Sequence, residues 1–339
     1  MEALSGAPRT LVIAPNWVGD LVMAEPVLAA LARSGRELTL FVKAPLAPLA
    51  RLLPGVAATL VKTGDAAAAV AAMAAGGFDE AVVLPNSFRS AWLPVRAGIA
   101  RRFGYRGDLR APLLAPALPR PRGRRPQVED YRELLAAMEV PAPDDWVPRL
   151  ALPAGLVEGG RERLARARIE VGRQPLVGLF PGAEWGPSKR WPMARFAELA
   201  RELRKRRPAL AEIVVAGPKE VWLAVRVHEE SGRIHPVIGP DLDLAGLAGV
   251  LSHLEVLVTN DSGPMHLAAA LGVPCVALFG PTDRRRTAPA GEGHQVLSLD
   301  RWCSPCFRRR CPLLHHRCLR GIGAGTVADA ALAALDRPR

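Results

Sequence analysis

The sequence predicts an α/β protein of two Rossmann-like domains whose parallel sheets face each other across a cleft. Short apolar runs alternate with polar loops and helical stretches, which is the pattern of parallel βαβ units. The pattern fills residues 1–150 and begins again in 151–325, after a proline-rich stretch at 141–153. A chain of 339 residues is long enough for two such domains, and residues 326–339 add a C-terminal helix.

In the first half, each expected strand is followed by a polar loop. Buried strands are expected at 10–14, 38–42 and 81–84. The loop after the first strand ends in Asp20, and helical periodicity starts at Leu21. Pro26 either opens that helix or bends it. Residues 101–125 carry eight arginines against one aspartate among prolines and glycines, so they are expected to form a loop-rich basic segment.

The second half repeats the pattern. Strands are expected at 176–180, 213–216, 256–258 and 275–279. Its most informative segment, 257–283, reads strand, polar turn, short helix, strand. Pro264 suits the first helical turn, because proline lacks the amide hydrogen that would be orphaned there. Such a helix N-terminus offers free amides and a positive dipole end, which suits a phosphate. From these residues alone, a simple N-cap role for Asp261 or Ser262 is equally consistent.

Composition narrows the class of protein. Hydrophobic residues make up 49% of the chain, so it is expected to be globular. No apolar run approaches the roughly 18 residues of a membrane span, and the N-terminus lacks a signal pattern, so a cytoplasmic protein is expected. The net charge of +12 favours an anionic partner: nucleic acid, a phosphorylated glycolipid or an anionic membrane face. Abundant Ala, Gly, Pro and Arg also suit a GC-rich genome, so composition alone has little weight.

Several motif classes are missing. No G-x-G-x-x-G follows the first strand, which argues against a nicotinamide cofactor, and no Walker A sequence indicates a P-loop NTPase. No G-x-S-x-G elbow indicates a hydrolase. The ionisable groups instead lie on loops at the carboxyl ends of strands, where ligands bind in such sheets. These loops carry Asp20 in the first half and Ser188-Lys189-Arg190, Lys219-Glu220 and Asp261-Ser262-Gly263 in the second.

This arrangement fits transfer from a diphosphate donor. Cations and a helix N-terminus in the second domain would hold the leaving diphosphate, and Asp20 would deprotonate the attacking hydroxyl. Direct displacement with a single base would invert the anomeric centre. Taken singly, each residue has a plainer interpretation: Asp20 as an N-cap, Lys189 and Arg190 as solvated charge, and His266 as a satisfied core histidine. Trp17 and Trp191 are expected to pack at the bases of loops.

Four long segments, in this order, resemble the bacterial ADP-heptose:lipopolysaccharide heptosyltransferases of glycosyltransferase family 9. They are PNWVGDLVMAEPVL (15–28), VLPNSFRSAWLPVRAGIARRFGYRG (83–107), FPGAEWGPSKRWP (180–192) and VTNDSGPMHLAAALGVPCVALFGPT (258–282). The resemblance covers nearly the whole chain, and the second and third segments favour the type that adds the second heptose, heptosyltransferase II. It implies a GT-B fold, an inverting mechanism and no metal or other cofactor in catalysis.

The resemblance also implies the substrates and the site. The donor would be ADP-L-glycero-β-D-manno-heptose, and the acceptor a heptose on the Kdo–lipid A inner core at the cytoplasmic face of the inner membrane; no nucleic acid is implied. Asp20 would be the general base, and Lys189 would neutralise the leaving diphosphate. Glu220 would reach the ribose of ADP. The donor site would comprise Glu184, Ser188, Glu220, Asp261, Ser262, Gly263 and His266. The acceptor side would comprise Asn86, Ser87 and Arg89, with Arg101, Arg102 and Arg106 meeting carboxylates or phosphates of the inner core.

Four of the five cysteines crowd into one segment with the spacing C-x2-C-x4-C-x6-C. They are Cys303, Cys306, Cys311 and Cys318, with His315 and His316 between the last two. Four thiolates would suit a structural zinc ion, although these intervals differ from those of common zinc ribbons. Because a similar cluster occurs in some relatives and not in others, a catalytic role is not expected. For these four cysteines, a structural zinc ion or another thiolate-bound metal is the first expectation, reduced thiols the second and disulfides the third.

Other functions compete with this interpretation. Heptosyltransferase I shares the fold and donor and differs on the acceptor side. A nucleotide-sugar epimerase would keep the two domains but leave the basic and NSFRSA segments without a use. A nucleic-acid-binding module would need aromatic residues among the arginines, and residues 106–125 contain none. A non-catalytic protein that binds the nucleotide sugar is the remaining alternative.

Overall fold

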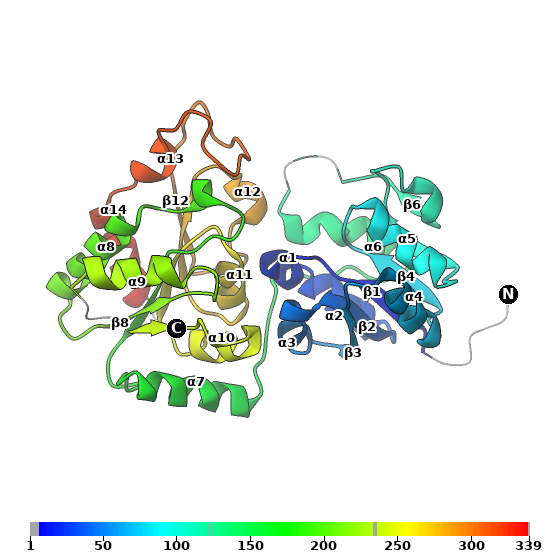
Figure 1. The fold of residues 1–339 in the computed structure, drawn as a ribbon, viewed down its shortest axis with the longest axis horizontal. Helices are drawn as coiled ribbons and strands as arrows, with labels where there is room; N and C mark the ends of the chain where they lie inside the picture. Colours follow the sequence, from blue (N-terminus) through cyan, green and yellow to red (C-terminus); the bar gives the residue numbers. More distant parts are fainter. Residues whose placement is uncertain (1–6, 122, 124, 233–235, 338–339) are drawn as a thin grey trace. The chain divides into compact units, whose positions relative to one another are not determined.

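The computed structural model describes residues 7–121, 123, 125–232 and 236–337. The chain divides into two compact units after Ala151, one residue beyond the expected boundary. Each unit contains a six-stranded sheet whose paired strands are all parallel, with helices on its faces (Figure 1). The prediction of two Rossmann-like units is therefore confirmed. No helix within these described ranges is long and apolar enough to cross a membrane.

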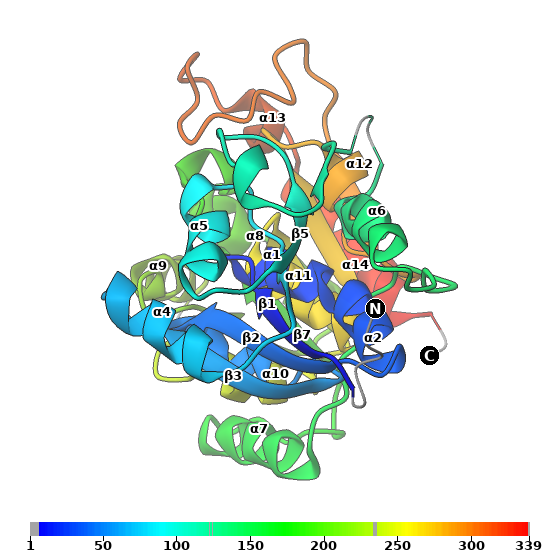
Figure 2. The same ribbon diagram turned by 90° about the vertical axis from the view of Figure 1, so that its right-hand side faces the viewer.

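The first unit has the strand order β3-β2-β1-β4-β5-β6. Its strands are β1 (Arg9–Ile13), β2 (Glu37–Lys43), β3 (Val56–Lys62), β4 (Glu80–Val83), β5 (Arg101–Tyr105) and β6 (Ala117–Leu118). Its helices are α1 (Val18–Met23), α2 (Glu25–Arg33), η1 (Ala44–Leu46), α3 (Ala47–Ala50), α4 (Ala66–Ala75), α5 (Phe88–Arg96), η2 (Ala111–Leu113), η3 (Gln127–Tyr131) and α6 (Arg132–Ala137). Helices α4 and α5 cover one face of the sheet and α2 and α6 the other (Figure 2).

Two details of this unit differ from the sequence expectation. Residues 101–105 form strand β5 rather than part of a loop, because Phe103 and Tyr105 are buried in the sheet despite the surrounding arginines. The first helix begins at Val18, three residues earlier than expected, and ends before a second helix that starts at Glu25. Pro26 lies in the first turn of that second helix, so it opens the helix rather than bending it.

The second unit has the strand order β12-β11-β10-β7-β8-β9. Its strands are β7 (Leu176–Phe180), β8 (Ala211–Val215), β9 (Val237–Ile238), β10 (Val256–Asn260), β11 (Cys275–Phe279) and β12 (Gln295–Ser298). Its helices are α7 (Ala154–Arg166), η4 (Pro187–Lys189), α8 (Met193–Arg206), α9 (Val221–Glu230), α10 (Leu244–Leu251), α11 (Gly263–Ala270), α12 (Arg284–Thr287), α13 (Arg317–Arg320) and α14 (Ala324–Leu335). Helices α8 and α14 cover one face of the sheet with a continuous apolar core.

Close helix packing in the second unit depends on glycine. Helices α7 and α10 approach so closely that a Cβ at Gly249 would lie 2.2 Å from the carbonyl oxygen of Leu156. A Cβ at Gly160 would meet the Gly249 carbonyl at the same distance. Since no side chain fits there, these two glycines let the helices pack backbone against backbone.

A buried carboxylate in β8 predicts a pH-dependent stability. Glu212 is 5% exposed, and burial raises its pKa to about 8 from an ordinary value of 4.5. The folded state therefore binds the proton more tightly than the unfolded chain, so its stability falls as the pH rises from about 4.5 to about 8. We expect Glu212→Gln to raise the free energy of unfolding by about 1–3 kcal/mol at alkaline pH and to change it little at pH 5.

Urea unfolding followed by fluorescence measures this effect at both pH values. The exposed Glu158, in α7 of the same unit, provides the control substitution Glu158→Gln, which should change neither midpoint. An equal gain for Glu212→Gln at both pH values would show that the charge of Glu212 is not the cause.

Candidate functional site

An ion pair lies at the carboxyl edge of the second sheet. Lys189 Nζ is 2.6 Å from Asp261 Oδ2, and the two side chains are 14% and 5% exposed. Thr282 Oγ1 donates a hydrogen bond of 2.6 Å to the same carboxylate oxygen, and the ammonium lies 5.3 Å from the centre of the Trp185 ring. These contacts hold the lysine in one place. Sequence reasoning identified both charged residues but missed Thr282, whose only signal was its position in the turn after β11.

The first turn of α11 is left open beside this pair. Ser262 occupies the N-cap position with extended backbone, but within the described residues no side chain caps the helix. The Ser262 hydroxyl lies 3.1 Å from Thr259 Oγ1, and the Asp261 carboxylate is paired with Lys189. The plain N-cap interpretation of Asp261 and Ser262 is therefore wrong. The amides that begin at Gly263 and the nearby ammonium together suit a phosphate.

The long loop after β7 is tied to β10 by a buried asparagine. Asn260 Nδ2 donates to the carbonyls of Pro181 (2.9 Å) and Gly182 (3.2 Å), and Asn260 Oδ1 accepts from the Trp191 amide (2.9 Å). Trp191 is 1% exposed and its Nε1 donates to the Ile322 carbonyl, so its packing role is confirmed. Asn260 thereby fixes both ends of the loop that carries Lys189. Sequence reasoning missed this role.

Glu220, between β8 and α9, supports the same loop. Its Oε1 accepts from the Ala183 amide (2.9 Å) and from Arg190 Nη2 (2.8 Å), and its side chain is 10% exposed. A Cβ at Gly182 would lie 2.3 Å from Glu220 Oε2, so a larger residue there would displace this carboxylate. Arg190 is thus an ion-pair partner, and its interpretation as solvated charge is wrong. Lys189 is likewise paired rather than solvated.

Three further donor-site candidates differ in setting. Glu184 Oε1 pairs with Lys219 Nζ at 3.2 Å, and both side chains are exposed. His266 is 6% exposed, and burial lowers its pKa to about 4, so its imidazole is neutral at pH 7 although Asp261 opposes the shift. Ser188 is buried, and its hydroxyl donates 2.5 Å to the carbonyl of Arg308. Ser188 therefore anchors the cysteine-rich segment to the Lys189 loop.

In the first unit, Asp20 lies in the first turn of α1. The N-cap of this helix is Trp17, so the interpretation of Asp20 as an N-cap is wrong. Asp20 Oδ1 accepts a hydrogen bond of 2.9 Å from Gln127 Nε2 in η3. The carboxylate thus lies at the positive end of this helix, and the Gln127 amide orients it. Trp17 is 41% exposed, so its expected packing role holds only in part. Gln127 carried no signal in the sequence.

The loop after β4 is organised by a buried arginine that sequence reasoning missed. Arg110 is 0% exposed, and burial lowers its pKa to about 10. Its guanidinium donates to the Tyr105 carbonyl (2.7 Å), to Ser90 Oγ (3.2 Å) and to Asn86 Oδ1 (3.1 Å). Ser87 caps α5 by accepting from the Ser90 amide at 3.3 Å. Arg110 thus sets the position of Asn86 from beneath the loop.

Two of the arginines expected at the acceptor side lie elsewhere. Strand register pairs Arg101 with Glu80 and Arg102 with Ala81, so both begin β5 at the amino edge of the sheet, opposite Asn86. Arg101 Nη1 lies 3.5 Å from Glu80 Oε2, and the Arg102 guanidinium donates to backbone carbonyls. Their assignment to the acceptor side is therefore wrong. Arg106 follows β5 at the carboxyl edge and is exposed, so its assignment stays a prediction.

A basic cluster occupies the carboxyl edge instead, of which sequence reasoning named Arg89 but missed the two lysines. Lys43 ends β2 and Lys62 ends β3, and exposed Arg89 lies in α5. The pKa of Lys62 is lowered by partial burial and then by the positive charges of Arg89 and Lys43, which places the three cations near one another. Such a cluster suits an anionic ligand.

The four clustered cysteines are free thiols and line one pocket of about 210 Å³ together with His315 and His316. Among the described residues, however, no group of three or more His, Cys, Asp or Glu side chains is arranged to hold a metal ion. The structure therefore gives no support to the zinc prediction. Burial raises the pKa of the Cys318 thiol, which favours its protonated form.

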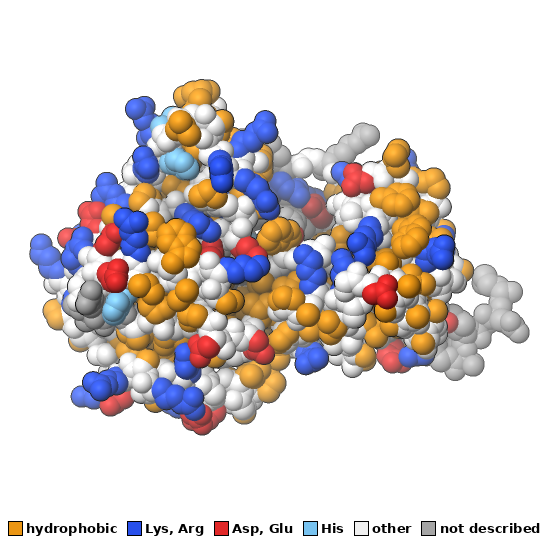
Figure 3. All heavy atoms as spheres, in the orientation of Figure 1, with side chains coloured by type: hydrophobic (Ala, Val, Ile, Leu, Met, Phe, Trp, Pro, Cys, Tyr) orange, Lys and Arg blue, Asp and Glu red, His pale blue; other side chains and the backbone are white. Residues whose placement is uncertain are grey.

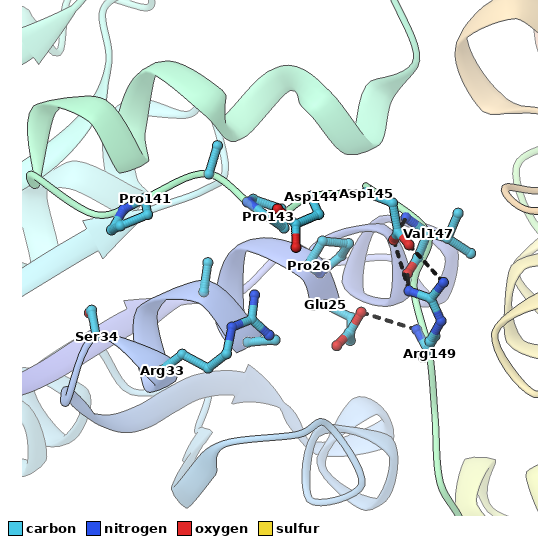
Figure 4. Close-up of a pocket in the computed structure, with 13 residues that line it drawn as sticks. Glu25, Pro26, Arg33, Ser34, Pro141, Pro143, Asp144, Asp145, Val147 and Arg149 are labelled. Carbon is cyan, nitrogen blue, oxygen red and sulfur yellow. Dashed lines mark hydrogen bonds and ion pairs between the residues drawn. The ribbon is translucent and has the colours of Figure 1, made fainter.

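A second pocket, of about 540 Å³, lies in the first unit between α2 and residues 141–149 (Figure 4). Its lining includes none of the predicted site residues. Glu25 Oε2 accepts a hydrogen bond of 3.1 Å from the Arg149 amide, and burial raises the pKa of this carboxyl. The contact ties the 141–149 segment to α2, so we regard this pocket as part of the framework.

Comparison with known proteins finds long matches to heptosyltransferases. The chain is 32% identical over 310 residues to lipooligosaccharide heptosyltransferase 2 of Haemophilus ducreyi, covering 86% of this chain and 88% of that protein. It is 31% identical over 316 residues to lipopolysaccharide heptosyltransferase 2 of Escherichia coli, with the same coverage. The solved structure of ADP-heptose lipopolysaccharide heptosyltransferase II of E. coli superposes with a TM-score of 0.82 at 28% identity, over 96% of this chain and 98% of that one.

This likeness shows that the fold is of the GT-B type. Residues 67–316 match the family described as glycosyltransferase family 9 (heptosyltransferase). The match covers just over half of the first unit and most of the second, and it includes the Lys189, Glu220 and Asp261 loops. The chain therefore belongs to glycosyltransferase family 9 and is a heptosyltransferase.

Proposed function

We propose that this enzyme moves L-glycero-D-manno-heptose from ADP-heptose to the first heptose of the Kdo–lipid A inner core, with inversion. The acceptor hydroxyl oxygen bonds to the anomeric carbon as the bond from that carbon to the diphosphate breaks. The hydroxyl proton passes to Asp20, and ADP leaves with the electron pair. The observation that carries this proposal is the likeness to type II enzymes across 86% of the chain.

The donor half of the proposal rests on the second unit. The Lys189 ammonium and the open first turn of α11 supply positive charge and amides where the diphosphate gains charge. Asp261 does not face the phosphate in this scheme, because a carboxylate would repel it. It instead holds Lys189, and Thr282 completes the contact. Neutral His266 adds no charge to this site.

The acceptor half rests on the first unit. The Gln127 amide orients the Asp20 carboxylate, which would accept the hydroxyl proton. Asn86 and Ser87 lie on the loop that Arg110 supports, and the Lys43, Lys62 and Arg89 cluster is suited to the anionic groups of the inner core. Because Asp20 and Lys189 belong to different units, transfer requires one substrate pair to engage both.

The basic cluster predicts a selective effect on the acceptor. We expect Lys62→Gln combined with Arg89→Gln to raise the acceptor KM about tenfold, because charge-assisted contacts to carboxylates or phosphates are lost. The Kd for ADP should stay unchanged. Steady-state kinetics and ADP titration give both values. Arg101→Gln, at the other edge of the sheet, is the control and should leave both constants unchanged; a higher Kd for ADP in the double variant would contradict the assignment.

Transfer to defined acceptors tests the proposed function. Purified enzyme and ADP-heptose are incubated with Kdo–lipid A acceptors that carry zero, one or two heptoses. Mass spectrometry then identifies the products. We expect addition only to the acceptor with one heptose. Addition only to the heptose-free acceptor would make the enzyme a heptosyltransferase I. Binding of ADP-heptose without transfer to any acceptor would indicate a non-catalytic protein.

A further inference from the structure

The segment 301–320 lies between β12 and α14, ends in α13 and projects from the second unit (Figure 1). It contains the four clustered cysteines, which the transferase chemistry leaves without a role. The same segment also carries six arginines and no acidic residue; they are Arg301, Arg308, Arg309, Arg310, Arg317 and Arg320. All six are exposed. This segment therefore presents a charge of +6 within 20 residues.

Apolar side chains are exposed on the same segment. Among the described residues, ten large apolar side chains are exposed, and four of them fall between 302 and 314. Trp302 is 89% exposed, Phe307 55%, Leu313 44% and Leu314 81%. Figure 3 shows hydrophobic atoms at the tip of this region with basic side chains beside them. Clustered exposure of this kind is unusual for a surface that faces only water.

The base of the segment is held firmly while its tips remain free. The amides of Cys306 (3.0 Å) and Phe307 (2.8 Å) donate to the Pro281 carbonyl, and Ser188 Oγ donates to the Arg308 carbonyl. Leu319 is 1% exposed and packs in the core of the unit. The backbone is thus fixed against two loops of the donor site, so the exposed side chains do not result from a loose end.

We propose that segment 301–320 is a docking surface for an anionic lipid bilayer. Tryptophan and leucine insert at the level of the headgroups, while arginines bind the anionic phosphates around them. A second copy of the chain fits poorly, because a two-fold contact would bring two sets of six arginines together. Nucleic acid would use the arginines and the aromatic rings but gives exposed Leu313 and Leu314 no partner.

The inference deepens the proposed function, since the proposed acceptor is a lipid that lies in a membrane. Segment 301–320 is joined to the Ser188-Lys189 loop through the Arg308 carbonyl, so a bilayer held by this segment would lie close to the donor site of the second unit. Neither the donor nor the acceptor is needed for the surface to bind, and the two proposals can therefore fail separately.

Vesicle co-sedimentation tests the proposal with purified full-length protein under reducing conditions. Vesicles of phosphatidylcholine alone are compared with vesicles of phosphatidylcholine mixed with phosphatidylglycerol. We expect binding only to the anionic vesicles, weakened by added salt. Replacing Arg308, Arg309 and Arg310 by glutamine should weaken partitioning by about fivefold per arginine, or roughly 100-fold in total. Trp302→Ser with Leu314→Asn should weaken it about tenfold.

Matched controls lie outside the segment. Replacing the exposed Arg161, Arg166 and Arg168 by glutamine removes the same charge from α7 and the loop after it. The second control combines Trp222→Ser with Leu109→Asn. Like the test pair, it removes one exposed tryptophan and one exposed leucine. Both leucines have a positive φ, 57° at Leu109 and 56° at Leu314. Both controls should bind anionic vesicles as the unaltered protein does, and thermal unfolding should show that every variant is folded.

Several results would overturn the proposal. They are failure of the unaltered protein to bind anionic vesicles, equal binding to phosphatidylcholine alone, and unchanged binding by folded segment variants. An equal loss of vesicle binding in the control that lacks Arg161, Arg166 and Arg168 would show that total charge, and not this segment, determines binding. A segment variant that binds vesicles normally but changes the oligomeric state would assign the surface to a second copy instead. All these readouts are taken without ADP-heptose, so they stand whatever the outcome of the transferase assay.

Discussion

Asp20→Asn is expected to keep ADP-heptose binding and to lose about 10²–10⁴-fold in kcat, the range that general-base catalysis contributes. The amide has nearly the shape of the carboxylate and can still meet the Gln127 side chain, but it cannot accept the acceptor's proton. Since Asp20 and the diphosphate site lie on different units, the Kd for ADP-heptose should not change. Single-turnover transfer and donor titration measure the two quantities separately.

The control for Asp20→Asn is a substitution of the same kind in the same unit. Asp108 is exposed, lies in the loop after β5 and has a φ of 46°, which asparagine accommodates well. Asp108→Asn should therefore leave transfer unchanged. Gln127→Ala offers a second check: it should lower kcat less than Asp20→Asn does, because the base remains but loses its orientation. Turnover of Asp20→Asn at the unaltered rate would exclude Asp20 as the base.

Lys189→Met is expected to lower kcat by about 10²–10³-fold, because the diphosphate loses the cation that stabilises it as it leaves. It should also weaken ADP binding, since the charge of bound ADP is then opposed by an unpaired Asp261. Steady-state kinetics and calorimetric titration with ADP provide the two values. Lys189→Arg keeps the charge and should retain part of the activity, although the fork of arginine does not reproduce a 2.6 Å lysine–carboxylate contact.

Loss of the buried pair can also lower stability, because one substitution leaves a carboxylate uncompensated. The double variant Lys189→Met with Asp261→Asn removes both charges and should regain stability without regaining kcat. Lys219→Met is the surface control, because Lys219 pairs only with the exposed Glu184 within the described residues. If the double variant recovered full activity, Lys189 would not be needed at the leaving group.

The sequence predicted the fold because its signals are local. Strands buried on both faces of a parallel sheet are short apolar runs, and each turns into a polar loop at its carboxyl end. This pattern located the loops of Asp20, Asn86, Lys189 and Asp261 correctly. The prediction of a loop at Arg101 was wrong. The many arginines hid the alternating apolar positions, Phe103 and Tyr105, which are buried in the sheet. A strand of five residues carries too few apolar positions to outweigh that charge.

The sequence could not predict which distant residues contact one another. Nothing in the spacing shows that Thr282 meets Asp261, that Gln127 meets Asp20, or that Arg110 lies under Asn86. These contacts form because elements far apart in the chain become neighbours in the folded unit. The same reason accounts for the wrong placement of Arg101 and Arg102: the parallel register with β4 decides which edge of the sheet they occupy.

By itself, the sequence determined that two α/β units each carry charged loops at the ends of their strands, because the alternation of apolar runs and polar turns encodes this directly. Only the tertiary structure decided which charges are paired and which face water. It joined Lys189 to Asp261, left the first turn of α11 open, brought four thiols to one pocket without a metal arrangement among the described residues, and exposed Trp302 and Leu314 beside arginines. Pairing and exposure depend on neighbours supplied by chain folding, which local composition does not contain.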